Sequence, residues 1–371
     1  MPSVLPDMEI LRRLPKVELH RHLEGSMRHA TLWEFHQKQQ QSLHASLEAL
    51  TEATSIADGQ APGFTEFLSR FDKLRFKYGG PEEIERIAAE AVADAAADGI
   101  VHLELRFSPV FYARRMKDAQ PLDAVESTAE VEAAAQAVVR GAMREAAKTK
   151  MSLTFIATLA RHLGLQVNVP TLELLKRPVG SYIMGLDLAG DESFPGFDFS
   201  KSFCRWKAYG RGITVHAGED PRANASQSVI EAARVLRAAR IGHGIRAFSD
   251  KQLMTQLAKS RMPLETCPTS NVQTQACESY AAHPLKAMIE SNVNATINTD
   301  DPSICRTTLT REYQLAMSAC GLDWPQLRQC AINASRSAFL LINSRTDLIK
   351  RITAAWQDAS APEPSQGMRE D

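Results

Sequence analysis

Eight short runs of β-branched and apolar residues recur along the chain and alternate with longer amphipathic stretches. We expect strands at Lys16–His20, Ile100–Phe107, Ser152–Thr158, Tyr182–Leu188, Ile213–His216, Arg240–His243, Pro263–Thr266 and Ala295–Thr299. The helical patterns include Pro81–Ala97, Leu122–Lys148, Ser226–Ala239 and Pro284–Ser291. Strands that alternate with helices predict a parallel sheet, and a count of eight predicts an α/β fold of the closed (β/α)8 TIM-barrel type. A doubly wound open sheet is the alternative, but no GxGxxG motif follows any strand candidate.

Two regions fall outside this alternation. The long connection from Leu23 to Gly99 predicts extra helices between strands 1 and 2, with a surface helix and loop around Gln37–Ala61. The last residues, 358–371, are polar and contain proline, which is typical of a disordered tail. Because no internal repeat and no linker interrupts the rest, we expect one barrel domain over residues 1–357.

Charge and composition limit the partners of the chain. The 371 residues contain 43 Lys and Arg against 44 Asp and Glu, which argues against a nucleic-acid partner. No apolar run approaches the ~20 residues that span a bilayer, and the N-terminus resembles no secretory signal, so no membrane partner is expected. The six cysteines form no CxxC pair and are expected to be reduced thiols of a cytoplasmic protein. The oligomeric state cannot be inferred from the sequence.

The first candidate for a chemical site is the pair His20 and His22 at the end of the first strand candidate. Side chains two residues apart on a strand point to the same face, so both imidazoles can reach one metal ion. An isolated HxH pair is a weak signal, because two ordinary core or surface histidines near a strand end would look the same.

Three other strand ends also carry ionisable groups. His216 ends a strand and is followed by Glu219, His243 lies between two glycines, and Asp300 and Asp301 follow the eighth strand candidate. Each could be a turn with solvated acids or a helix cap when taken alone. Together they lie where barrels build active sites, and three histidines with one carboxylate can form a zinc site with an open position for water.

The segments ELHRHLEGS, DLAGDE, HAGED, RIGHG and NTDDP, in this order, resemble the motifs of the adenosine deaminase family within the amidohydrolase superfamily. The similarity runs from about Pro15 to Leu341. It implies that one Zn2+ per subunit is held by His20, His22, His216 and Asp300. It also implies that Glu219 protonates N1 of a purine, and that His243 orients or deprotonates the attacking water and stabilises the charge in the tetrahedral state. DLAGDE offers no bridging lysine, which favours one metal over two.

The resemblance also implies a small-molecule purine substrate, with adenosine and 2′-deoxyadenosine converted to inosine and 2′-deoxyinosine plus ammonia. Asp301 would bond N7 and the backbone of Gly190 would bond N3. Glu24 stands where nucleoside-acting members more typically carry Asp facing the ribose, so adenine and aminodeoxyfutalosine are alternative substrates. A non-catalytic purine-binding protein is a further alternative. The segment GFTEFLSRF has the period of a buried helix face and is expected to form an apolar lid with Phe64, Phe67, Leu68 and Phe71.

Other polar residues near strand ends receive weaker assignments. Asp187 and Asp191 of DLAGDE are expected to be structural, and Arg161 at the end of the third strand candidate is a possible substrate contact.

Overall fold

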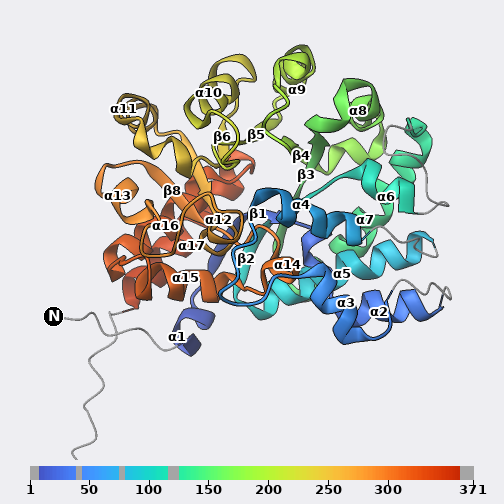
Figure 1. Cartoon of the computed structure of the whole chain (residues 1–371), viewed down its shortest axis with the longest axis horizontal. Coiled ribbons are helices and arrows are strands. Elements are labelled where there is room, and N and C mark those ends of the chain that lie inside the picture. Colours follow the sequence, from blue (N-terminus) through green and yellow to red (C-terminus); the bar gives the residue numbers. More distant parts are fainter. Residues whose placement is uncertain (1–7, 39–43, 75–79, 116–124, 360–371) are drawn as a thin grey trace, which may run out of the picture.

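Eight parallel strands form one sheet in the order in which they occur along the chain. The computed structural model describes residues 8–38, 44–74, 80–115 and 125–359. The strands are β1 Lys16–His22, β2 Ile100–Phe107, β3 Ser152–Ala160, β4 Ile183–Ala189, β5 Gly212–Ala217, β6 Arg240–His243, β7 Pro263–Thr266 and β8 Asn294–Ile297. Helices surround these strands (Figure 1). The predicted (β/α)8 barrel is therefore confirmed.

The barrel closes between its last and first strands, just beyond the end of β8. The backbone N–H of His22 donates to the carbonyl of Asp300 at 2.8 Å, and the N–H of Asp300 donates to the carbonyl of His20 at 2.8 Å. A parallel bridge between Arg21 and Asp300 accompanies these bonds. The closure thus brings three sequence-predicted site residues together through the backbone alone.

The connection between β1 and β2 contains the expected extra helices. After a single 3-10 turn at Glu24–Ser26 it forms α2 His29–Lys38, α3 Leu47–Thr54, α4 Phe64–Lys73 and α5 Pro81–Ala97. The Gln37–Ala61 segment is less superficial than expected, because Leu50 and Ile56 are fully buried.

The remaining α-helices precede β1 or follow the later strands. They are α1 Met8–Arg13, α6 Pro109–Arg115, α7 Thr128–Thr149, α8 Gly164–Glu173, α9 Ser200–Ala208, α10 Ala225–Ile230, α11 Lys251–Ser260, α12 Pro268–Gln273, α13 Leu285–Glu290, α14 Pro302–Cys305, α15 Leu309–Ser318, α16 Trp324–Ser337 and α17 Ile342–Asp358. In the described part of the chain, no helix has the length and apolarity needed to cross a membrane. Residues 360–371 of the expected tail lie outside the described residues.

Two helix predictions differ from the structure for local reasons. The helix expected from Leu122 begins at Thr128, because Ser127 and Glu130 form a reciprocal capping box at that point; residues 122–124 lie outside the described residues. The helix expected to reach Ala239 changes at Glu231–Val235 into a π-helical turn. Arg237 then takes a left-handed backbone conformation with φ of 56°, which ends the helix before β6.

The barrel interior beneath its carboxyl-terminal rim is ionic as well as apolar. Arg106 of β2 lies 3.2 Å from Asp187 of β4 and 2.9 Å from Glu265 of β7. Arg240 of β6 lies 2.5 Å from Glu265 and 2.5 Å from Glu104 of β2. None of these side chains is more than 1% exposed. Two guanidinium groups thus face three carboxylates, which leaves the network one negative charge in excess and favours a cation nearby.

Candidate active site

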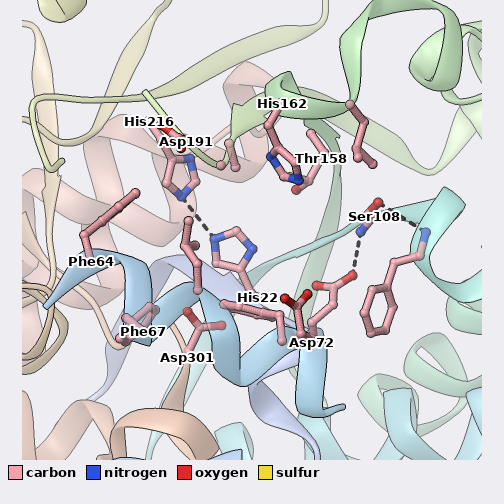
Figure 2. Close-up of a pocket in the computed structure, with 18 of the residues that line it drawn as sticks. His22, Phe64, Phe67, Asp72, Ser108, Thr158, His162, Asp191, His216 and Asp301 are labelled. Carbon is pink, nitrogen blue, oxygen red and sulfur yellow. Dashed lines mark hydrogen bonds between the residues drawn. The ribbon is translucent and has the colours of Figure 1, made fainter. Parts of the chain in front are cut away.

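The histidines at the strand ends converge on a small volume at the carboxyl-terminal rim. His20 Nε2 lies 3.1 Å from His216 Nε2, and His22 Nε2 lies 3.2 Å from the same atom. Asp300 Oδ1 lies 3.2 Å from His20 Nε2 and 3.5 Å from His22 Nε2. Figure 2 shows His22 and His216 pointing toward one another. The four predicted ligands therefore lie within reach of one ion.

Two buried carboxylates determine which imidazole nitrogens face the centre of this cluster. His20 Nδ1 lies 2.8 Å from Glu265 Oε2, and His216 Nδ1 lies 3.0 Å from Asp187 Oδ1. A carboxylate accepts a hydrogen bond, so each Nδ1 donates and each Nε2 keeps a lone pair. Two lone pairs 3.1 Å apart repel one another unless a cation lies between them. The donor set therefore fits a metal ion, and Nε2 imidazole with carboxylate suits zinc.

The electrostatic field of the cluster also favours a cation. Burial and Arg106 lower the pKa of His20, but hydrogen bonds with Asp300 and Glu265 outweigh both and raise it. Burial raises the pKa of Asp300, yet the surrounding histidines, with His20 first, hold that pKa well below its usual range. An anionic Asp300 next to two imidazole lone pairs is an arrangement that a divalent ion stabilises.

Geometry alone defines two overlapping groups of possible ligands. Donor atoms of His20, His216, His243 and Asp300 lie within 4.8 Å of one another, and so do those of His22, Asp187 and His216. The first group thus contains His243, which we predicted to be a catalytic residue, and omits His22, which we predicted to be a ligand. The tautomer of His243 determines whether His243 or His22 serves as the third histidine ligand.

Backbone strain marks two of these positions. His243 has φ of 59° and Asp300 has φ of 63°, both in the left-handed region that few residues other than glycine adopt. Residues held in this way cost about 1–3 kcal/mol each and cluster at functional sites. At Asp300 the two backbone bonds to β1 hold the strained conformation in place.

A buried acid and a buried arginine fix the turn that carries Glu219. The carboxylate of Glu192 accepts backbone N–H bonds from Gly218 and Glu219, both at 2.8 Å, and from Asp220 at 3.1 Å. Arg161 donates to the carbonyl of His216 at 2.5 Å. These bonds satisfy backbone groups beyond the end of β5. Arg161 therefore holds the protein backbone, which corrects its interpretation as a possible substrate contact.

Glu219 and Asp301 are carboxyl groups in surroundings that disfavour charge. Burial raises the pKa of Glu219 well above its ordinary value, and the nearby charges of Asp300 and Glu192 raise it further. Burial and the charges of Asp300 and Glu24 likewise raise the pKa of Asp301. Both environments therefore favour the neutral form, in which a carboxyl group can donate a proton or a hydrogen bond.

A cavity of about 1000 Å³ opens above the cluster. Every predicted site residue except His20, which is wholly buried beneath it, lines this cavity. Phe64 and Phe67 of α4 lie on one side in Figure 2, and Thr158 and His162 lie on the other. The predicted helix is present as α4, and Leu68 and Phe71 also line the cavity; the role of this helix as a lid stays a prediction.

Glycine is required at two places in this wall. A Cβ on Gly190 would lie 2.5 Å from His162 Nδ1, and Gly190 has φ of 95°. A Cβ on Gly25 would lie 1.9 Å from Asp301 Oδ1. A side chain at either position would displace a group that lines the cavity.

Glu24 lies in the same wall with its carboxylate oriented by the backbone. Its Oε1 accepts the N–H of Ser108 at 2.7 Å. Burial raises the pKa of Glu24 to about 7, although the Ser108 bond opposes this change. Its charge therefore changes near neutral pH.

Sequence reasoning missed the residues that support the predicted ligands from below. Glu265, Arg106 and Arg240 make the ionic contacts described above, and Glu192 holds the turn of Glu219. A signal was available in the sequence, because Arg106 and Glu265 are charged residues within strands of a parallel sheet, where side chains are buried. A charge at such a position needs a partner, and hence predicts an internal network.

Comparison with known proteins agrees with this architecture. The model of the family described as adenosine deaminase matches residues 15–355. An adenosine deaminase of Escherichia coli is 37% identical over 346 residues, which cover 92% of this chain and 98% of that protein. The chain belongs to the adenosine deaminase family.

Solved structures with lower identity share the fold. An adenine deaminase from Arthrobacter aurescens is 23% identical, with a TM-score of 0.80, and the match covers 93% of this chain and 100% of that one. An amidohydrolase from Burkholderia ambifaria with bound Zn is 22% identical, with a TM-score of 0.81 and coverage of 95% and 93%.

The carboxylate–histidine pairs predict a measurable effect on metal affinity. Glu265→Gln removes the negative charge and one of the two acceptor oxygens from the group that orients His20, so we expect metal to bind about 10- to 100-fold more weakly. Asp187→Asn should act in the same direction through His216. The measurement is competition with a zinc chelator.

Glu312→Gln is the matched control for both variants. Glu312 is also buried, but its carboxylate bonds the backbone of Thr269 and the hydroxyl of Thr307. Metal affinity that falls equally in Glu312→Gln would show that the loss reflects general destabilisation and not ligand orientation.

Proposed function

We propose that this protein is a zinc-dependent deaminase that hydrolyses adenosine and 2′-deoxyadenosine to inosine and 2′-deoxyinosine with release of ammonia. The observation that carries the proposal is the convergence of His20, His22, His216 and Asp300 beside a neutral acid, Glu219, in one cavity. Membership of the adenosine deaminase family supports the same reaction.

In this proposal one Zn2+ is held by His20, His22, His216 and Asp300. When bound, the ion lowers the pKa of a coordinated water toward neutrality, so that hydroxide is available at pH 7. The residues of the chain supply the rest. Asp187 and Glu265 keep the Nε2 lone pairs of His216 and His20 turned toward the ion.

Glu219 is the proton donor to N1 of the purine. Attack at C6 places negative charge on the ring unless N1 is protonated, so an acid that is still protonated at neutral pH lowers the barrier. The raised pKa of Glu219 meets this requirement, and Glu192 fixes the position of its backbone. Ammonia then leaves C6 and the 6-oxo product remains.

The cavity wall supplies the groups that orient the purine. Asp301, kept neutral by its raised pKa, can donate a hydrogen bond to N7. The backbone N–H of Gly190 bonds N3, and the absence of a Cβ permits the ring to approach. Phe64, Phe67, Leu68 and Phe71 cover the apolar surface of the base. Glu24 lies where it can bond the sugar.

A panel assay tests this substrate assignment. Ammonia release is followed with zinc-loaded protein on adenosine, 2′-deoxyadenosine, adenine, N6-methyl-AMP and aminodeoxyfutalosine. We expect the first two to be turned over with the highest kcat/KM. Preference for adenine or a 5′-modified nucleoside would overturn the substrate while leaving the chemistry, and no turnover of any compound would favour a non-catalytic purine-binding protein.

Substitution of Glu219 tests the proposed acid. Glu219→Gln should retain zinc and the wild-type melting temperature but lose about 100-fold or more in kcat, because the amide cannot supply the proton. The exposed Glu278→Gln is the control and should be indistinguishable from wild type. Near-normal turnover by Glu219→Gln would refute its role as proton donor.

The pKa of Glu24 predicts a pH dependence of nucleoside binding. Below about pH 7 the side chain is neutral, and above it the carboxylate accepts a charge-assisted bond from a ribose hydroxyl. The inhibition constant of inosine should therefore fall as pH rises through about 7. The expected decrease is about tenfold, which corresponds to about 1.4 kcal/mol of binding free energy. The measurement is the ratio of the inhibition constants of inosine and hypoxanthine, because hypoxanthine lacks the sugar. Glu24→Gln should make this ratio independent of pH, and a ratio that still changes would assign it to another group.

A further inference from the structure

A chain of hydrogen bonds runs from the backbone at the start of α13 to the imidazole of His243. The N–H of Leu285 lies 3.2 Å from His283 Nδ1, and His283 Nε2 lies 3.1 Å from Asn271 Oδ1. Asn271 Nδ2 then lies 3.0 Å from His243 Nδ1. The three side chains are buried, and Asn271 and His243 are 0% exposed.

The backbone fixes the direction of the first two bonds. A backbone N–H can only donate, so Nδ1 of His283 is the acceptor and carries no hydrogen. Burial lowers the pKa of His283 to about 3, so the ring is neutral and its hydrogen is on Nε2. That Nε2–H donates to Asn271 Oδ1.

A second backbone group fixes the orientation of the Asn271 amide independently. The N–H of Cys267 donates to Asn271 Oδ1 at 3.1 Å. Because two donors meet at this oxygen, it must be the carbonyl end of the amide, and the NH2 end faces His243. His243 Nδ1 therefore accepts a hydrogen bond. A ring that accepts at Nδ1 has no hydrogen there, so His243 is neutral and carries its one ring hydrogen on Nε2.

This tautomer is the opposite of the one imposed on His20 and His216. In those residues a carboxylate takes the Nδ1 hydrogen and Nε2 is left as a lone pair. In His243 an amide donates to Nδ1, and Nε2 presents an N–H to the cavity. That nitrogen lies 3.3 Å from Glu219 Oε2 and 4.0 Å from Asp300 Oδ2. Within the described residues it makes no hydrogen bond. A buried N–H left in this way is destabilising unless a ligand accepts it.

We propose that Asn271 and His283 are positioning residues that hold His243 as an Nε2–H donor, so that His243 orients the attacking water through an oxygen lone pair and does not deprotonate it. The proposal rests on the function proposed above, in which a water attacks beside Glu219. Nε2 with its hydrogen can neither bind a metal ion nor accept a proton. His22 therefore completes the metal site, although His243 also lies within 4.8 Å of the donor atoms of His20, His216 and Asp300.

The tautomer can be measured directly in the zinc-loaded protein. Two-bond 1H–15N correlation spectra of protein labelled with 15N-histidine distinguish Nε2–H from Nδ1–H rings, and the signals of His243 are assigned by their loss in His243→Gln. We expect wild-type His243 to be the Nε2–H form. A wild-type Nδ1–H ring overturns the proposal outright, whether or not any Asn271 variant folds.

Asn271→Asp is the variant that should reverse the tautomer. One carboxylate oxygen can still accept from Cys267 and His283, while the other accepts from His243 Nδ1 and turns Nε2 into a lone pair. We expect the Nδ1–H form, unchanged zinc stoichiometry and a fall in kcat of about 100-fold or more, with KM changed much less. His243 that keeps the Nε2–H form in folded Asn271→Asp would overturn the role of Asn271.

Asn333→Asp is the matched control. Asn333 is also buried, but its amide bonds the carbonyl of Ala295 and the side chain of Gln329. It should lower stability without changing the spectrum of His243. Because the spectra are recorded without substrate, failure of the panel assay with the expected tautomers would reject the proposed function and the orientation of an attacking water, and would leave standing only the control of the His243 tautomer by Asn271 and His283.

Discussion

The orientation of lone pairs at the barrel rim depends on one buried guanidinium. Arg106 lies between Asp187 and Glu265, the two carboxylates that direct His216 and His20. Those acids could not remain ionised at this depth alone, because burial raises their pKa values. Arg106 helps to hold both pKa values down, together with His216 for Asp187 and with Arg240 for Glu265. Loss of this charge would disturb both histidines together, although neither histidine forms a hydrogen bond to Arg106.

The same rim presents two kinds of imidazole within a few ångströms. Carboxylate partners give His20 and His216 a lone pair toward the cavity, whereas an amide partner gives His243 a hydrogen toward it. The chemical difference between ligand and donor therefore arises from residues beneath the site. It explains how four imidazoles can crowd together and still take separate roles. The left-handed backbone at His243 and Asp300 places these groups where regular strands would not.

Most of the fold and the residues facing the cavity could be predicted from the sequence. The alternation of elements identified the barrel, and residues such as His22 and Asp301 lie at or just after the ends of strands, where position alone predicts a rim location. The supporting layer could not be predicted in this way, because pairs such as Arg106 with Glu265 join residues 159 positions apart. Their contact depends on strand register and barrel closure, which one sequence does not specify. The π-helical turn at Glu231–Val235 was missed because it is compatible with a helical hydrophobic pattern.

One apolar wall of the cavity is formed by α4, within the connection between β1 and β2, whereas the donors of the proposed metal site stand at or just beyond strand ends. A connection of this kind can change its length and side chains during evolution without altering the barrel that holds the histidines. Within such a lineage the recognised purine can therefore change through substitutions in the β1–β2 connection, while the residues that carry out hydrolysis are inherited unchanged.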